Sequence, residues 1–206
     1  MDVGIINYGL GNIRSLSNSI NKINKKFEIV NNPNDIGKFN KIILPGVGSF
    51  RKAMSLIEKK KWDIEIKKYT NNNKNQILGI CLGMQILGTI GYEFGNTNGL
   101  DLIGGEVKFL RELGCKKNLP HIGWNDVKIK QDNILFKNIP DFSSFYFVNS
   151  YSIHLENKLD EIGSSEYGVD FTSIVNSQNI FGVQFHPEKS SKVGLQLLKN
   201  FIDAQS

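Results

Sequence analysis

The stretch Gly79-Ile80-Cys81-Leu82-Gly83-Met84-Gln85 places a cysteine between small residues, at the end of an apolar run. The run 76–80 predicts a buried strand, and residues 84–87 predict the start of a helix. A thiol on such a sharp turn is lifted clear of the sheet, and N–H groups of the following helix point towards whatever it attacks. The flanking glycines fit, because the turn leaves no room for side chains. We expect Cys81 to be a nucleophile; a buried structural cysteine is the alternative.

The composition is typical of one soluble globular domain spanning residues 1–206. Hydrophobic residues make up 40% of the chain and charged residues 22%, which is ordinary for a soluble protein. No apolar run approaches the length of a membrane span, and the N-terminus has no signal peptide pattern. The two cysteines, Cys81 and Cys115, are too few for a disulfide framework or a metal cluster. We expect a cytoplasmic location and no membrane partner.

The formal net charge of +5 raises the question of a nucleic-acid partner. The lysines are scattered in short groups, however, with no aromatic residues interleaved and no recognisable nucleic-acid module. Such lysines are typical of solvated helix faces and loops. We therefore expect no nucleic acid to bind.

The first half of the chain alternates short apolar runs with longer amphipathic segments. This alternation predicts a parallel sheet with helices on both faces. Ligands bind such sheets beyond the carboxyl ends of the strands, where residues 9–11, residues 45–48 and Cys81 all fall. The expected strands are 3–6, 27–30, 42–44 and 77–80, and the expected helices begin at Ile13 and at Ala53, the second with Trp62, Ile64 and Ile66 extending its apolar face.

The second half differs, because little helix separates its apolar runs. Some of its strands should therefore pair in antiparallel fashion. Together the two halves predict an α/β fold: a mostly parallel sheet flanked by helices, with antiparallel strands in the second half. The expected strands are 107–110, 127–130, 145–148, 172–175 and 180–185, and the last helix is expected over 192–202.

A second candidate group, Phe185-His186-Pro187-Glu188, directly follows an apolar strand. Beside an extended proline, His186 and Glu188 lie two residues apart and can point the same way. Glu188 can then accept a hydrogen bond from one imidazole nitrogen, which leaves the other nitrogen for a thiol. Acyl transfer requires this arrangement of nucleophile, base and orienting group. A capped strand end with a surface carboxylate is the alternative.

The other two histidines fit catalysis less well. His121 has no adjacent acid except Asp126. His154 lies in a polar segment, which is typical of a solvent-facing strand residue. His186 is therefore the expected base.

The turn Pro45-Gly46-Val47-Gly48 follows another apolar strand. Two glycines around one residue allow a peptide to turn over and present its N–H. Together with the N–H of Leu82, this gives a two-donor oxyanion hole; an ordinary strand-to-helix turn is the alternative. No Gly-Lys-Ser/Thr ending follows, which excludes a phosphate-binding P-loop.

The pattern Gly-x-Cys-x-Gly-x-Gln at 79–85, with the distant His-Pro-Glu at 186–188, resembles the class I, or triad, glutamine amidotransferases. The similarity is closest to one branch, the glutaminase subunits that make imidazole glycerol phosphate with a cyclase in histidine biosynthesis. It spans nearly the whole chain, so its segments are jointly very specific. Those segments are 8–12, 45–50, 120–125 and 184–191.

The resemblance implies a class I glutamine amidotransferase-like, flavodoxin-like fold and a role for each matching residue. Cys81 would attack the side-chain carbonyl of L-glutamine. His186 would take and return the proton, and Glu188 would orient His186. The oxyanion hole would come from Val47, Gly48 and Leu82, the glutamine site from Gly46, Gln85, Asn149, Ser150 and Tyr151, and the partner interface from Asn12, Trp124, Tyr146 and Lys189.

The same resemblance implies a heterodimer with a (β/α)8-barrel cyclase subunit. Ammonia would leave the glutamine first and pass through a tunnel into the barrel. Water would then release glutamate from a thioester on the glutaminase. The resemblance implies no metal and no organic cofactor.

One position departs from the family pattern, because Asn149 stands where the family usually has histidine. Asparagine keeps one hydrogen bond but cannot titrate. The departure keeps open a related glutaminase that supplies ammonia, with a cyclase-like partner, to a sugar amidotransferase in surface polysaccharide synthesis. Two further alternatives are a stand-alone cysteine hydrolase and a non-catalytic interaction module on the same fold.

Overall fold

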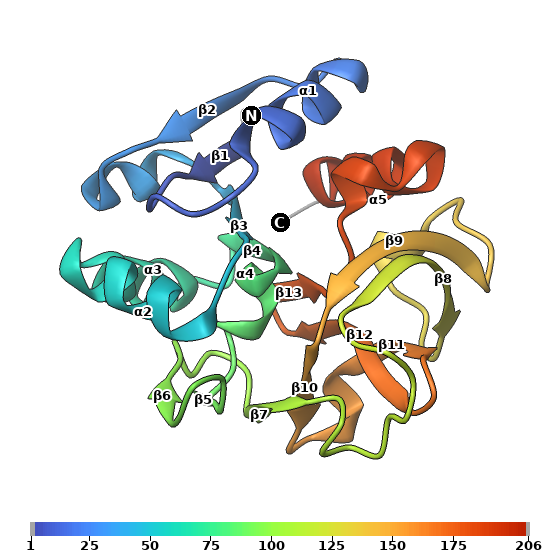
Figure 1. Ribbon diagram of the computed structural model, residues 1–206. Coiled ribbons are helices and arrows are strands. Elements are labelled where there is room, and N and C mark those ends of the chain that lie inside the picture. The colour runs from blue at the N-terminus through green and yellow to red at the C-terminus, as the bar shows by residue number, and fades with distance from the viewer. Residues whose placement is uncertain (1–2, 205–206) are drawn as a thin grey trace.

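The computed structural model describes residues 3–204, with a nine-stranded sheet at its centre (Figure 1). Met1 and Asp2, where a leader would begin, lie outside the described residues. In chain order the strands of this sheet are β1 (Val3–Ile6), β2 (Phe27–Val30), β3 (Lys41–Gly46), β4 (Gln76–Cys81), β8 (His121–Ile129), β9 (Ser143–Asn149), β11 (Glu161–Glu166), β12 (Asp170–Ser177) and β13 (Ile180–Val183).

The sheet changes from parallel to antiparallel pairing at β13. Its strand order is β2-β1-β3-β4-β13-β12-β11-β8-β9. The pairs from β2 to β13 are parallel, and those from β13 to β9 are antiparallel. The expected α/β class, with antiparallel strands contributed by the second half, is confirmed.

Helices cover both faces of the parallel half (Figure 1). The strands β1, β3 and β4 are buried along their whole length, as a parallel sheet covered on both faces requires. Ile43 packs in one core with α1 and α5, whereas Ile42 and Leu44 pack in the other with α2 and α3, because successive strand residues point to opposite faces. The four helices are α1 (Ile13–Lys22), α2 (Phe50–Lys59), α3 (Trp62–Thr70) and α5 (Ser191–Asp203).

The expectation of one helix from Ala53 through Ile66 is wrong, because the chain breaks between α2 and α3. Lys61 has a φ of 62°, in the left-handed region, and redirects the backbone. Trp62 and Ile66 are fully buried four residues apart, but Ile64 between them is 55% exposed. Residues spaced by two cannot share one face of a helix. The apolar spacing at 62, 64 and 66 therefore does not describe a buried face.

Several strands of the second half differ in length from the apolar runs that predict them, and others have no such run. A separate four-stranded sheet has the order β10-β7-β5-β6, and only β7 was expected in it. β8 begins at His121 rather than at residue 127, because exposed and less exposed residues alternate along its first half and form no continuous apolar run. Among residues 3–204 no helix is both long and apolar enough to cross a membrane. The strands of the small sheet are β5 (Ile90–Gly91), β6 (Thr97–Asn98), β7 (Gly105–Phe109) and β10 (Tyr151–Leu155).

Candidate active site

The turn at Cys81 joins β4 to the short helix α4 (Leu82–Gln85). Cys81 has φ 54° and ψ −110°, a conformation that residues other than glycine rarely adopt. The strand register pairs Cys81 with Gly46, so the turn lies beside the carboxyl end of β3. Strain of this kind gathers at functional sites. The structure therefore places the thiol where a parallel sheet binds its ligands.

The helix after Cys81 has four residues, and is shorter than the sequence pattern predicts. The backbone leaves the helix because the carbonyls of Ile86 and Leu87 accept hydrogen bonds from the N–H groups of Leu100 and Leu102. This tertiary contact overrides the local helical pattern. So short a helix has little dipole, and the donors near the sulfur are individual N–H groups such as that of Leu82.

Two glycines allow α4 to pack against the sheet. A Cβ on Gly83 would lie 1.9 Å from the carbonyl oxygen of Leu44, and one on Gly79 would lie 2.6 Å from the carbonyl oxygen of Gly83. Neither backbone oxygen can move aside without disturbing β3 or the turn itself. The space around the turn therefore excludes side chains on both flanks of Cys81, as the sequence indicates.

His186 and Glu188 lie directly after β13, beside the thiol. Nδ1 of His186 is 2.9 Å from Oε1 of Glu188, and both side chains are about 96% buried, with 4% exposed. The backbone N–H of His186 donates to the carbonyl of Tyr146, and Oγ of Ser190 donates to the carbonyl of His186. Burial lowers the pKa of His186, but hydrogen bonds to Cys81 and Glu188 raise it, and the net pKa is well above the ordinary value. The imidazole is thus held between the thiol and the carboxylate.

One cavity of about 260 Å³ brings most of the candidate residues together. Gly46 lines a smaller neighbouring cavity with His186 and Glu188. Within residues 3–204, no three His, Cys, Asp or Glu side chains are grouped so that they could hold a metal ion. The cavity is lined by Val47, Gly48, Cys81, Leu82, Gln85, Glu93, Pro120, Val148, Asn149, Ser150, Tyr151 and His186.

The turn after β3 lies across from the thiol. Gly48 has a φ of 105°, which favours glycine. A Cβ on Gly46 would lie 2.7 Å from the backbone nitrogen of Gly83, so the two turns are in close contact. The Val47–Gly48 peptide and the N–H of Leu82 therefore border the same cavity as the sulfur.

Asn149 supports the turn that ends β9. Its Nδ2 donates to the carbonyl of Tyr151 at 3.1 Å, and Nε2 of Gln85 donates to the same carbonyl at 3.0 Å. The side chain of Asn149 is 5% exposed. The departure from the family's histidine thus keeps a hydrogen bond to the backbone and touches neither His186 nor Glu188 in the contacts of the described residues.

His121 faces Asn149 across the β8–β9 pair. Its ring is stacked on Tyr167 at 4.0 Å and on Phe147 at 5.0 Å, and is 2% exposed. Burial lowers the pKa of His121 to about 4, although the neighbouring side chain of Asn149 opposes the shift. His121 is a neutral core residue, and His154 is an exposed residue of β10, as expected.

The neutral state of His121 predicts a pH-dependent stability. Between pH 6.5 and about 4 the unfolded chain binds a proton at His121 that the folded chain does not, so stability falls as the pH falls. The free energy of unfolding in urea, measured at pH 6.5 and at pH 4, should therefore fall with acid by about 3 kcal/mol less in His121→Phe than in the wild type. His154→Phe at the exposed site is the control. Parallel pH profiles for the wild type and His121→Phe would contradict the assignment.

Glu93 is a cavity residue that the sequence did not indicate. Its Oε2 accepts a hydrogen bond from the N–H of Phe50 at 2.7 Å, at the start of α2. The N-cap of α2, Ser49, provides no side-chain hydrogen bond, so Glu93 takes over the capping role. No local motif marks Glu93, because it lies in a loop that the small sheet folds back over the cavity.

Three of the four expected interface residues form one exposed cluster. Trp124 and Tyr146 pair in the β8–β9 register with ring centroids 6.1 Å apart, and Nζ of Lys189 lies 5.7 Å from the ring of Tyr146. Trp124 is 55% exposed. Asn12 instead caps α1, accepting from the N–H of Ser15, and lines the small cavity beside His186. We call Trp124, Tyr146 and Lys189 the aromatic cluster.

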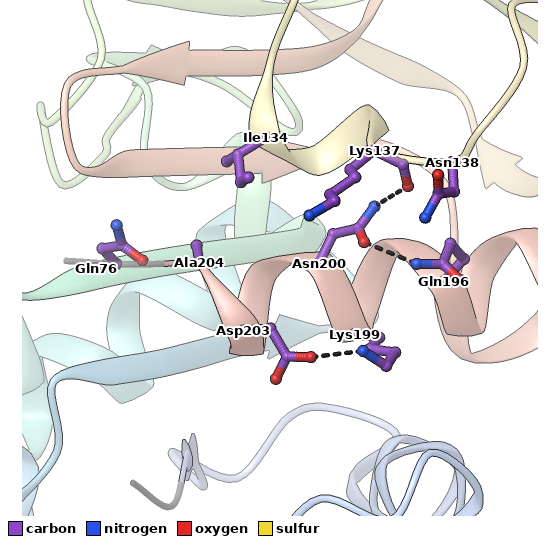
Figure 2. A pocket seen from close by; sticks show the side chains of 9 residues that line it. All are labelled: Gln76, Ile134, Lys137, Asn138, Gln196, Lys199, Asn200, Asp203 and Ala204. Carbon is purple, nitrogen blue, oxygen red and sulfur yellow. Dashed lines mark hydrogen bonds and ion pairs between the residues drawn. The ribbon is translucent and has the colours of Figure 1, made fainter.

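A larger cavity of about 620 Å³ lies at the other end of the sheet, at the start of β4 (Figure 2). Its central side chain, Asn200, donates to the carbonyls of Leu135 and Lys137 and accepts from Gln196. Figure 2 shows these amides directed at one another rather than into open space. They hold α5 against the short 3-10 helix Ile134–Phe136, and the cavity includes no residue of the candidate active site.

The amino-acid sequence places the chain among known proteins. The family described as "Glutamine amidotransferase class-I" matches residues 4–204. A relative named "Imidazole glycerol phosphate synthase subunit HisH", from Methanosarcina barkeri (strain Fusaro / DSM 804), is 45% identical over 201 residues, 97% of this chain and 96% of the relative. Relatives of the same name from Desulfitobacterium hafniense (strain DSM 10664 / DCB-2) and Pelagibacter ubique (strain HTCC1062) are 41% and 37% identical, covering 97% and 98% of this chain and 92% and 100% of theirs.

Solved structures show the same fold. One described as "Crystal structure of glutamine amidotransferase" superposes with a TM-score of 0.77 at 13% identity, covering 98% of both chains. Another, "Structure of PurLQS from Thermotoga maritima", gives a TM-score of 0.75 at 17% identity and covers 98% of this chain and 97% of that one. At these identities the likeness shows the fold alone, whereas the sequence relatives are far closer. The chain belongs to the class I glutamine amidotransferases, and within them to the family of imidazole glycerol phosphate synthase subunits HisH.

Proposed function

We propose that this chain hydrolyses L-glutamine to glutamate and ammonia at Cys81, as the glutaminase subunit of an imidazole glycerol phosphate synthase. One observation carries the proposal. Cys81, on a strained turn, shares a cavity with His186, whose Nδ1 is held 2.9 Å from Glu188. Relatives at 37–45% identity over nearly the whole chain carry the name of that synthase subunit.

In the first half of the reaction Cys81 attacks the side-chain amide of glutamine. The sulfur forms a bond to the amide carbon, and the carbonyl oxygen becomes an oxyanion. The N–H groups of Leu82 and of the Val47–Gly48 turn donate hydrogen bonds to this oxyanion and stabilise its charge. His186, which takes the proton of the Cys81 thiol, gives that proton to the amide nitrogen, the C–N bond breaks, and ammonia leaves. A glutamyl thioester remains on Cys81.

In the second half water releases the glutamate. His186, now neutral, takes a proton from water as it attacks the thioester carbon. The C–S bond breaks, glutamate leaves, and the sulfur and imidazole return to their starting state. Glu188 keeps Nδ1 of the ring occupied, so the other nitrogen faces the reacting atoms throughout.

The substrate's α-amino and α-carboxylate groups need partners in the same cavity. Both N–H groups of the Gln85 amide are used, one by the carbonyl of Tyr151 and one by Oε1 of Gln184, each at 3.0 Å. The carbonyl oxygen of Gln85 is therefore left as an acceptor for the ligand. Glu93 is a carboxylate on the cavity wall. We assign the substrate's ammonium group to these two acceptors, with the backbone at Ser150 alongside.

Glu93→Gln should raise the KM for glutamine by about 10- to 100-fold with little change in kcat, because a charged hydrogen bond becomes a neutral one. Glutamine can still accept from the N–H of Phe50, so the cap on α2 is kept. Steady-state glutaminase assays with the cyclase present give both constants. Glu156→Gln, on an exposed residue, is the control. An unchanged KM would contradict the assignment.

We further propose that the partner is a (β/α)8-barrel cyclase that receives the ammonia, and that the aromatic cluster is part of the surface it covers. Tyr146 supports this, since its carbonyl accepts from the backbone N–H of His186 and its N–H donates to Oγ of Ser190. A partner in contact with Tyr146 would thus touch a residue of β9 whose backbone is hydrogen-bonded to the base, His186. A cytoplasmic location fits the same chemistry, because the reaction needs Cys81 as a free thiol.

A glutamine analogue with a reactive diazoketone in place of its amide tests the proposed site. We expect one covalent adduct on Cys81 by mass spectrometry of a digest, formed faster when the cyclase is present. Cys115 should stay unmodified, because it is fully buried and its Sγ is 3.0 Å from the carbonyl of Tyr167. No adduct on Cys81, even with the cyclase present, would contradict a glutaminase and favour a non-catalytic module.

A further inference from the structure

Gln184 is a buried amide that approaches the nucleophile from the neighbouring strand. β13 and β4 are parallel with Val183 opposite Ile80, so Gln184 and Cys81 follow at the next step of the register. Gln184 and His186 are two residues apart on an extended chain, so their side chains point to the same side. Gln184 is fully buried, and its Nε2 is 3.8 Å from Sγ of Cys81.

The orientation of this amide follows from a fixed acceptor. The backbone carbonyl of Tyr151 can only accept, so the Gln85 atom 3.0 Å away from it is the nitrogen. The second N–H of that nitrogen then meets the oxygen of Gln184, also at 3.0 Å. This leaves the nitrogen of Gln184 facing the sulfur of Cys81. The chain Tyr151–Gln85–Gln184–Cys81 therefore has one consistent direction of hydrogen bonding.

We propose that Gln184 is a further catalytic residue, whose side-chain N–H donates to the sulfur of Cys81 while its carbonyl holds Gln85 with the acceptor oxygen towards glutamine. The proposal rests on the glutaminase function given above and deepens it. A donated hydrogen bond stabilises the negatively charged sulfur before attack. The same amide couples substrate binding to the nucleophile. If it rotated by half a turn, its nitrogen would face Gln85, and the Gln85 amide would have to exchange its own nitrogen and oxygen positions.

Alkylation of Cys81 by iodoacetamide tests this role without requiring glutamine hydrolysis. Gln184→Met keeps the length of the side chain but loses donor and acceptor, and Gln184→Glu keeps the shape and places a carboxylate at the sulfur. We expect alkylation at pH 7, followed by mass spectrometry, to slow about tenfold or more in each variant, with the pH profile moved to higher pH. The KM for glutamine should also rise in Gln184→Met, because Gln85 loses its fixed orientation.

Ser173→Ala is the matched control. Ser173 lies beside Gln184, because the backbone N–H of Gln184 donates to the backbone carbonyl of Ser173 at 2.8 Å. Both residues are fully buried. The hydroxyl of Ser173 has no hydrogen-bond partner within residues 3–204, so its removal should leave alkylation and KM unchanged. If the methionine variant does not fold, the glutamate variant carries the test. Wild-type alkylation rates and pH profiles in folded Gln184 variants would overturn the proposal, whereas a wild-type chain that alkylates but never hydrolyses glutamine would instead overturn the glutaminase function.

Discussion

Cys81→Ala is expected to reduce glutamine hydrolysis by about 10⁴-fold or more, to the level of the uncatalysed reaction in the assay. No other side chain in the cavity can form the glutamyl thioester, because Cys81 supplies its only sulfur. Glutamate release from glutamine, measured with the cyclase present, gives the rate. Because alanine removes only the thiol from a turn that the flanking glycines already shape, the variant should still fold and bind the cyclase.

Cys115→Ala is the matched control for this prediction. Cys115 is fully buried in the same hydrophobic core as Cys81, but it does not line the cavity, and its thiol donates to the backbone carbonyl of Tyr167. We expect wild-type kcat in this variant. Full activity in Cys81→Ala, or equal losses in the two variants, would contradict the assigned nucleophile.

His186→Asn is expected to lower kcat by about 10³- to 10⁴-fold, and Glu188→Gln by about 10²-fold. Asparagine cannot carry the proton from the thiol to the leaving ammonia. Glutamine at 188 can still contact Nδ1 of His186, but it no longer supplies the carboxylate that raises the pKa of that ring. Stopped assays of glutamate and ammonia with the cyclase present measure both losses.

The double variant gives the sharper result. Since Glu188 acts through His186, combining the two substitutions should cost no more than His186→Asn alone. His154→Asn, on the exposed face of β10, should leave kcat unchanged. Losses that multiply in the double variant would show that Glu188 acts independently of the base.

The parts of the fold that the sequence predicts best are those with local signals. Buried strands such as β1 and β4 are continuous apolar runs, and their burial on both faces explains that pattern. The prediction fails at Ile64, where apolar residues spaced by two suggested a buried helical face, and at α4, where a later loop takes the carbonyls that would continue the helix. The failure at Ile64 is local, because residues spaced by two cannot share one face of a helix. The failure at α4 is tertiary, because the N–H groups that take its carbonyls belong to Leu100 and Leu102, outside any local window.

The candidate site divides in the same way. Cys81, His186 and Glu188 lie in short motifs whose residue spacing already suggests their chemistry, and the structure brings them into one arrangement. Glu93 has no such motif, because the small sheet folds its loop over the cavity. Gln184 is part of a recognisable segment, but its contact with the sulfur becomes visible only when β13 is placed beside β4.

The most direct test of the account mixes the chain with a histidine-pathway cyclase and its ribonucleotide substrate and measures imidazole glycerol phosphate. We expect product with glutamine as the nitrogen source, no product from glutamine with Cys81→Ala, and product from both mixtures when an ammonium salt replaces glutamine. A cyclase that makes the product from ammonium but never from glutamine, with the wild-type chain present, would contradict the claim that Cys81 supplies its ammonia.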